Sequence, residues 1–137
     1  MSAAIHCLLT CDLCKVLALY PVRALIQDQL QKWTDILAPF GFKVGFIDGG
    51  VPTEYRGGIL ESSDVVLMTP DVTHAWMMSN LRSNSVTEFM AALQLLILDE
   101  AHVYDGAFGT HVAHLMRRIA AAARPFRLIC SPRGLRR

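Results

Sequence analysis

Two adjacent carboxylates, Asp99 and Glu100, follow the apolar run at residues 95–98 (LLIL). At the end of a buried strand both would lose hydration and repel each other, so a divalent cation would balance them. Asp99 would hold Mg²⁺ directly or through water, and Glu100 would orient and polarise an attacking water. His102 lies two positions further on and could hydrogen-bond toward the same pocket. The alternative is an acidic helix cap, with Asp99 satisfying free backbone amides.

Hydrophobic patterning predicts the elements that position these carboxylates. Apolar runs alternate with amphipathic stretches, which favours an α/β fold with a parallel sheet and helices on both faces. Asp71 is placed to cap a short helix, and Phe108, Val112, Leu115 and Ile119 would line the core face of a later one. Strands are expected at residues 16–20, 43–47, 65–69, 95–98 and 126–130, and helices at 22–37, 71–78, 86–93 and from 106 to about 123.

Other polar residues follow the predicted strands, and the carboxyl ends of parallel strands are where such sheets bind ligands. Arg23 opens a predicted helix, where free amides already favour a phosphate; the alternative is a solvated surface arginine. The Thr69 hydroxyl could instead satisfy local backbone. The residues expected at this edge are Tyr20, Pro21, Asp48, Gly49, Gly50, Thr69, Pro70, Asp71, Asp99, Glu100 and Ser131.

Composition narrows the classes of protein. The 137 residues are 53% hydrophobic and 18% charged, which excludes intrinsic disorder. A formal net charge of +1 gives no overall basic field for nucleic acid, so binding would depend on local arginines and amides. No apolar stretch reaches the roughly 18 residues of a membrane span, and the N-terminus lacks an early positive region. We therefore expect an intracellular location (cytoplasm, nucleus or nucleoid) and no membrane partner.

Cysteine and histidine spacings leave alternatives open. Cys11 and Cys14 have metal-knuckle or redox spacing, but reduced thiols packed as small apolar groups are favoured. His111 and His114, three apart on a predicted helix, could bind a metal together with His102; exposed or core-edge histidines are favoured instead. Trp33 and Trp76 could stack on bases, although packing is the preferred interpretation for both, most clearly for Trp33.

Three segments, in order, resemble superfamily 2 helicases. LLILDEAH resembles motif II, the Walker B strand with its DEAH box; LALYPVRALIQDQLQKW resembles motif Ia; and VVLMTPD resembles motif Ib. The resemblance covers roughly residues 16–130. YPVRALIQDQL and DEAHVYDGAFGTHVAHLMRRI are also similar to RecQ-like DNA helicases of the bacterial and fungal DEAH type.

The resemblance implies a three-layer RecA-like domain that uses ATP and Mg²⁺ in the intact parent. Asp99 and Glu100 would bind the nucleotide's Mg²⁺ and activate water, and His102 would couple the nucleotide and nucleic-acid sites. Single-stranded DNA is the implied partner, with RNA as the alternative. The residues implied to grip its backbone are Pro21, Arg23, Thr69, Pro70 and Asp71.

Two family features are not found. The sequence has no Gly-Lys pair, so it lacks the phosphate loop G-x-x-x-x-G-K-[ST], and Ser131-Pro132-Arg133 replaces Ser-Ala-Thr. These absences predict a fragment without the phosphate-loop strand: a non-conforming segment at 1–15, a partial RecA-like domain at 16–130 and a basic tail at 131–137. An exposed apolar sheet edge would follow, giving marginal stability or self-association.

The leading hypothesis is a partial motor domain of an ATP-dependent DNA helicase, inactive alone and binding nucleotide weakly or not at all. The alternative is a non-catalytic nucleic-acid-binding module that keeps the DNA-facing motifs. A weaker alternative is a small metal-dependent hydrolase using Asp99, Glu100 and the histidines.

Overall fold

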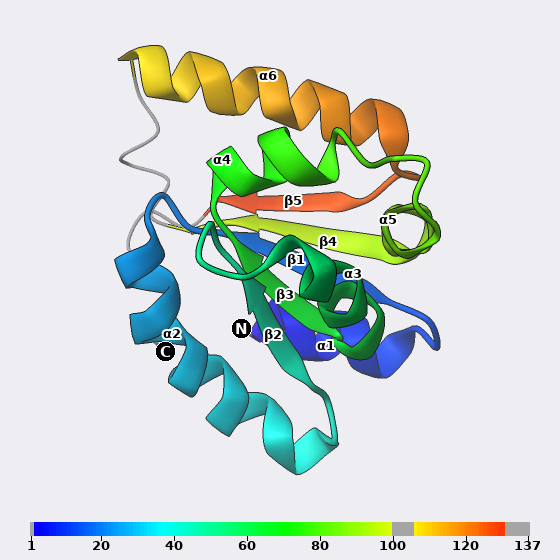
Figure 1. Cartoon of the computed structure of the whole chain (residues 1–137). Coiled ribbons are helices and arrows are strands. Elements are labelled where there is room, and N and C mark those ends of the chain that lie inside the picture. Colours follow the sequence, from blue (N-terminus) through cyan, green and yellow to red (C-terminus); the bar gives the residue numbers. More distant parts are fainter. Residues whose placement is uncertain (1, 100–105, 131–137) are drawn as a thin grey trace.

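The described part of the chain contains a five-stranded parallel sheet with helices on both faces (Figure 1). The computed structural model describes residues 2–99 and 106–130. The strands are β1 (Lys15–Leu19), β2 (Val44–Ile47), β3 (Val65–Met68), β4 (Leu93–Leu98) and β5 (Arg127–Cys130). The helices are α1 (Ser2–Thr10), α2 (Arg23–Leu37), η1 (Ala38–Phe40), α3 (Thr53–Ser62), α4 (Pro70–Val72), η2 (Thr73–Met77), α5 (Asn84–Ala92) and α6 (Gly106–Ala122). The predicted three-layer α/β class is confirmed.

The strand order is β2-β3-β1-β4-β5, and each neighbouring pair is parallel. β1 lies at the centre, with Leu19 paired to Met68 of β3 and to Leu98 of β4. The three strands therefore end at the same level. The ladder continues for one further bond on each side, because the amide of Tyr20 donates to Met68 and the amide of Asp99 donates to Leu19.

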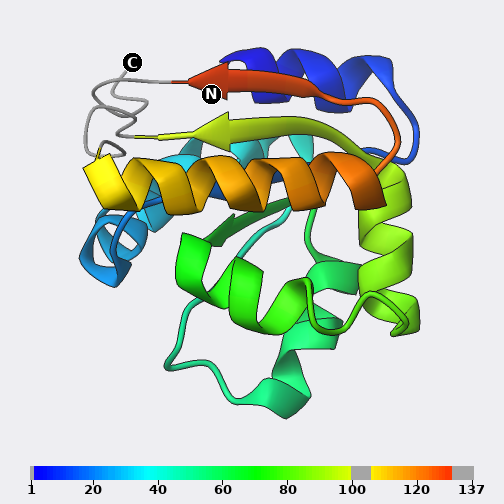
Figure 2. The ribbon, with the colours of Figure 1, turned by 90° about the horizontal axis from the view of Figure 1, so that it is seen from above.

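Each face of the sheet carries its own core, because successive side chains of a strand point to opposite sides. Leu17 and Leu19 of β1 pack with residues of α3, α5 and α6, whereas Val16 and Ala18 pack with α1 and α2. α6 runs along the length of β4 and β5 in both views (Figures 1 and 2). The continuous apolar runs that predicted the strands thus reflect burial on both faces.

The α2 helix is held on the second core by the residues that predicted it. Ile26, Trp33 and Leu37 are fully buried, and each such side chain contributes about 1.5–3 kcal/mol. The indole Nε1 of Trp33 donates a 2.8 Å hydrogen bond to the hydroxyl of Tyr20. Trp33 is therefore a core residue, as the spacing predicted.

Some elements differ from the sequence prediction. Helices α1 and α3 were not expected; α3 contains two adjacent glycines and buries Leu60 alone, so its periodicity is weak. The prediction that Asp71 caps the short helix is wrong, since Thr69 occupies the cap position and its side chain accepts from the Val72 amide. On α6, Val112, Leu115 and Ile119 are buried as predicted; the Phe108 side chain lies outside the described residues.

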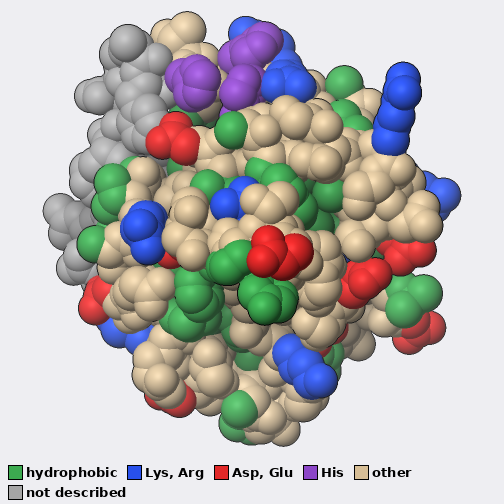
Figure 3. All heavy atoms as spheres, viewed as in Figure 1, with side chains coloured by type: hydrophobic (Ala, Val, Ile, Leu, Met, Phe, Trp, Pro, Cys, Tyr) green, Lys and Arg blue, Asp and Glu red, His purple; other side chains and the backbone are tan. Residues whose placement is uncertain are grey.

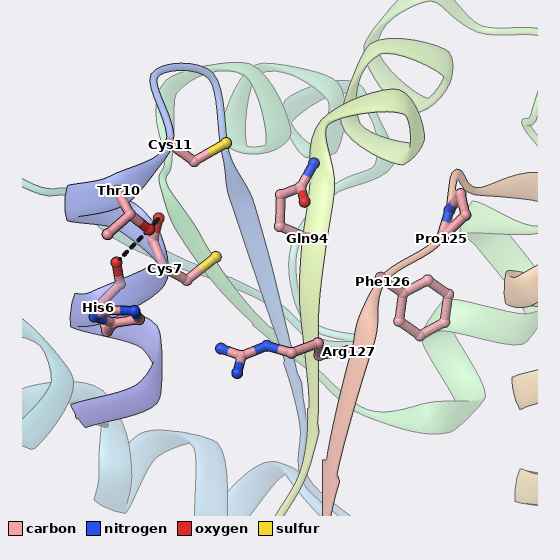
Figure 4. A pocket seen from close by; sticks show the side chains of 8 residues that line it. All are labelled: His6, Cys7, Thr10, Cys11, Gln94, Pro125, Phe126 and Arg127. Atoms are coloured by element: carbon pink, nitrogen blue, oxygen red, sulfur yellow. Dashed lines mark hydrogen bonds between the residues drawn. The ribbon is translucent and has the colours of Figure 1, made fainter.

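β5 is an edge strand of the described sheet and pairs with β4. Leu128 is 49% exposed, and Arg127 and Cys130 are exposed as well. A cavity of 420 Å³ lies between α1 and the start of β4 and β5. Arg127 and Cys7 point into it from opposite sides, whereas Phe126 points away (Figure 4). Leu128 is thus a large apolar side chain exposed at this edge, and the self-association expected from the sequence stays a prediction.

No helix within the described ranges combines the length and the apolar character that crossing a bilayer requires.

Candidate functional site at the carboxyl edge of the sheet

The predicted site residues on β1, β3 and β4 come together at one edge of the sheet. Pro21, Thr69 and Asp99 each follow the end of a strand, and those three strands are neighbours that end level. Asp48 joins them from β2, the strand beyond β3. The edge predicted from strand ends alone is therefore a real grouping of polar residues in the fold.

Asp99 lies directly after β4 and is fully buried. Its backbone amide donates a 3.0 Å hydrogen bond to the carbonyl of Leu19, which fixes the backbone of this residue to the central strand. Glu100 and His102, the other two predicted catalytic residues, lie outside the described residues. The described geometry therefore places one member of the acidic motif at the edge.

Arg23 is the first residue of α2, and its guanidinium pairs with the Asp48 carboxylate, with Nε 3.3 Å from Oδ2. The Arg23 side chain is 64% exposed, whereas that of Asp48 is 2% exposed. The other carboxylate oxygen of Asp48 accepts a 2.8 Å hydrogen bond from the Gly50 amide. Arg23 is thus not a freely solvated arginine, because the buried carboxylate of Asp48 holds its guanidinium at this edge.

Gly50 leaves room for the Arg23 side chain. A Cβ built at Gly50 would stand 2.5 Å from one guanidinium nitrogen of Arg23 and 3.2 Å from the Asp48 carboxylate. No side-chain hydrogen bond reaches Oδ2 of Asp48 in the described residues, so the pair is Coulombic and not an aligned N–H bond. Sequence reasoning placed Asp48 and Gly50 at the edge but did not pair Asp48 with Arg23, because that pairing requires the position of α2 relative to β2.

Thr69 and Pro70 start the short helix after β3. The Thr69 side chain accepts from the Val72 amide at 3.5 Å, and its carbonyl accepts a 2.8 Å bond from the Thr73 hydroxyl. Thr69 and Pro70 are buried, and Asp71 is exposed. The local-backbone interpretation of Thr69 therefore describes its structure, while Asp71 faces solvent at the same edge.

The fit of Mg²⁺ to this edge rests on Asp99. Mg²⁺ in nucleotide sites usually uses one or two carboxylates together with water and phosphate oxygens, so one buried strand-end carboxylate suits it. In the part of the chain that the structure describes, no group of three His, Cys, Asp or Glu residues is arranged to hold a metal ion. This absence does not extend to Glu100 and His102, which the metal-dependent hydrolase alternative would use together with Asp99, because both lie outside the described residues.

The N-terminal cysteines pack as reduced thiols. Cys7 and Cys14 are buried, Cys11 is half-buried, and none of them forms a disulfide. The Cys14 thiol donates a long, 3.6 Å hydrogen bond to the Cys7 carbonyl. Burial, followed by the neighbouring Cys11 and Cys7, raises the pKa of Cys14, so this thiol stays protonated. The packing interpretation of the Cys11–Cys14 spacing is therefore favoured over a metal or redox site.

His111 and His114 lie on the exposed side of α6, as the favoured interpretation predicted, and both face His74 of η2. Sequence reasoning missed His74, and its only signal was a lone histidine three residues after Asp71. Trp76 is half-buried against the core, with the Arg56 guanidinium 5.7 Å from its ring centre. Packing is thus the structural role of Trp76.

Comparison with known proteins agrees with the motifs. The family model described as DEAD/DEAH box helicase matches residues 1–131. The ATP-dependent helicase hrq1 of Schizosaccharomyces pombe is 37% identical over 111 residues, covering 78% of this chain and 10% of that protein. HRQ1 of Saccharomyces cerevisiae is 33% identical over 121 residues, covering 85% and 11%. The chain thus spans about a tenth of the length of these relatives.

Solved structures show the same fold. The DUF1998 helicase MrfA superposes with a TM-score of 0.84 at 25% identity, covering 95% of this chain and 21% of that one. The helicase domain of Pyrococcus furiosus Hef superposes with a TM-score of 0.70 at 21% identity, covering 96% and 27%. Since the family model matches nearly the whole chain, this protein belongs to the DEAD/DEAH box helicase family.

Proposed function

We propose that this chain supplies the part of an ATP-dependent helicase motor domain that binds one strand of DNA and carries the magnesium-binding carboxylate. The observation that carries the proposal is the level ending of β3, β1 and β4, which brings Thr69, Pro21 and Asp99 to one edge. Binding residues from separate strands can then act on ligands at neighbouring positions. An intracellular location belongs to the same proposal.

The nucleotide half of the proposal centres on Asp99. Its carboxylate would bind the Mg²⁺ of ATP, and Glu100 would orient the attacking water, with His102 linking this site to the nucleic-acid site. The sequence contains no Gly-Lys pair, so it has no lysine of the kind that binds the β- and γ-phosphates. We therefore expect the purified chain to bind ATP weakly or not at all and to show no hydrolysis. Hydrolysis that disappears in Glu100→Gln would contradict this expectation.

The nucleic-acid half uses Pro21, Arg23, Thr69, Pro70 and Asp71. Arg23 stands at the amino end of α2, where unpaired backbone amides favour a phosphate. The Arg23 side chain is 64% exposed while Asp48 holds it in place, so it can contact a strand without losing its buried partner. MrfA, which shares this fold, has been crystallised bound to DNA and AMPPNP. Single-stranded DNA is our proposed ligand.

Fluorescence anisotropy of a labelled oligonucleotide tests this half. Arg23→Gln should weaken binding of the DNA strand about equally for all sequences, because a phosphate contact carries no base information. Arg124→Gln is the matched control: it removes the same charge from an exposed residue near the start of β5, at the opposite edge. Equal affinities for the two variants would refute the role of Arg23. If an RNA of the same sequence binds more tightly than the DNA, RNA is the ligand instead.

A non-catalytic nucleic-acid-binding module is the second candidate, favoured by the absence of a Gly-Lys pair. Under this alternative the strand-binding edge is the whole function. The same anisotropy assay separates the two when ATP and Mg²⁺ are added at concentrations high enough to fill the weak nucleotide site expected of the motor domain, because they would leave strand affinity unchanged in a module of this kind. Weaker or tighter strand binding on addition of ATP and Mg²⁺ would favour the motor domain.

We also propose self-association through the edge strand β5. Leu128 is half exposed there, and an edge strand presents unpaired backbone groups to any second strand. Sedimentation velocity should show a concentration-dependent dimer that Leu128→Lys weakens. Tyr55→Lys is the control, because Tyr55 is 63% exposed on α3, which packs against β2 at the other end of the strand order. A monomer at every concentration, with a sharp unfolding transition, would contradict this proposal.

A further inference from the structure

Three imidazoles and one guanidinium meet on the outer surface where η2 packs beside α6. We name this group, formed by His74, His111, His114 and Arg118, the His–Arg cluster. The ring centre of His74 lies 5.1 Å from that of His111 and 6.1 Å from that of His114. One Nη of Arg118 lies 3.1 Å from Nδ1 of His74. Figure 3 shows the histidines as one purple patch beside basic side chains.

Positive charge in the cluster is not balanced by nearby acid. Within residues 2–99 and 106–130, Arg118 forms no ion pair with a carboxylate. Burial, then Arg118, His111 and His114, lowers the pKa of His74, while Asp71 alone acts in the other direction. The groups that face His74 are thus three basic side chains and a single acidic one. An anion bound here would relieve this repulsion.

The donors of the cluster suit a phosphate better than a metal cation. A guanidinium presents only N–H groups and each imidazole can present at least one, and a phosphate offers several strong oxygen acceptors to them. A metal ion would instead need three converging unprotonated nitrogens beside a guanidinium. No such group is found among the described residues. The ligand class is therefore an oxyanion.

The cluster is continuous with the proposed strand-binding edge. His74 follows Asp71 by three residues in one helical segment, a spacing that places both on the same side. His111 and His114 are exposed, and His74 is half-buried, so all three rings are open to a ligand from solvent. A strand whose backbone contacts Thr69 and Asp71 can therefore reach the cluster with a neighbouring phosphate.

We propose that the His–Arg cluster binds a phosphate group, supplied by the backbone of the strand held at the carboxyl edge. The identification of a DNA strand as the source of the phosphate rests on the proposed function, whereas the presence of an anion site does not. In the proposed complex the cluster extends the contact along the outer surface of η2 and α6. The cluster adds affinity for the strand that does not depend on the base sequence.

Two measurements on the whole chain test the inference. In the first, histidine ring proton signals are followed by NMR while inorganic phosphate is added at low ionic strength and constant pH. Signals of His74, His111 and His114 should move together and report raised pKa values, whereas the signal of His6 should not move. Arg118→Gln should weaken this response several-fold, and Arg124→Gln should not. Unmoved cluster signals would overturn the anion site.

In the second, oligonucleotide affinity is measured against salt concentration. Loss of one phosphate contact should reduce the slope of log affinity against log salt by about 0.7. Arg118→Gln and His74→Gln should each show this loss, and Arg124→Gln should keep the original slope. The slope could also stay unchanged in these variants while the cluster of the wild-type chain still responds to inorganic phosphate. That result would show that the phosphate does not come from the DNA strand, and the cluster would then be a site for free phosphate. Loss of binding in Arg23→Gln reports separately on the proposed function.

Discussion

The ion pair between Arg23 and Asp48 should contribute measurably to folding stability. Arg23→Gln removes the cation, and Asp48→Asn removes the anion but keeps an oxygen for the 2.8 Å bond from the Gly50 amide. At a separation near 3.3 Å, Coulomb's law gives about 1 kcal/mol in water and about 5 kcal/mol at an effective dielectric constant of 20. The 64% exposure of Arg23 brings the expected value toward the lower figure. We predict a coupling free energy of about 1–2 kcal/mol.

A double-mutant cycle by urea unfolding measures this coupling free energy. Wild type, both single variants and the double variant are unfolded under the same conditions, and the non-additive part of the change is the coupling. Asp71→Asn is the control for Asp48→Asn, because Asp71 is exposed and should change stability by less than about 0.5 kcal/mol. Unlinked positions add to within about 0.5 kcal/mol, so a coupling below that value would refute the argument that Asp48 holds Arg23.

Three further predictions concern the same edge and the His–Arg cluster. Gly50→Ala should weaken strand binding by less than Arg23→Gln, measured by anisotropy, because its Cβ would stand 2.5 Å from the far end of an exposed, flexible side chain that can shift and keep its charge; a loss as large as that of Arg23→Gln would contradict this. Thr69→Ala should cost about 1 kcal/mol in urea unfolding through loss of a helix cap, and Thr69→Ser should restore most of it. The lowered pKa of His74 means that the unfolded chain takes up this proton first as pH falls below about 6.5, so stability decreases toward acid. His74→Gln should make the urea midpoint less dependent on pH between about 7.5 and 5.5, and an unchanged pH dependence would contradict this.

The strands were predictable because burial on both faces leaves a continuous apolar run in the sequence. β1, β3 and β4 are almost entirely buried, and their predicted carboxyl ends lie within a residue of the observed ones. α3 could not be found in this way, since Gly57 and Gly58 interrupt its pattern and a single residue of it is buried. Local signals therefore identified the sheet but not every helix on it.

The candidate site was predictable to the extent that strand ends define it. Asp99 and Thr69 follow buried runs, and any parallel sheet brings such residues to one edge. The partnership of Arg23 with Asp48 and the meeting of His74 with His111 join residues that are far apart in the sequence. Those contacts depend on how helices pack on the sheet and on each other, and hydrophobic spacing does not encode that.

Because β3, β1 and β4 end at the same level, the distances between the backbones of the residues that follow them at the carboxyl edge are fixed. Neighbouring strands in a sheet lie about 4.8 Å apart, so the backbones of Thr69 and Asp99, on either side of β1, are separated by about 10 Å. This separation belongs to the hydrogen-bonded ladder and not to any side chain. Substitutions at the edge can therefore change how tightly each ligand binds while leaving the spacing between two bound ligands the same.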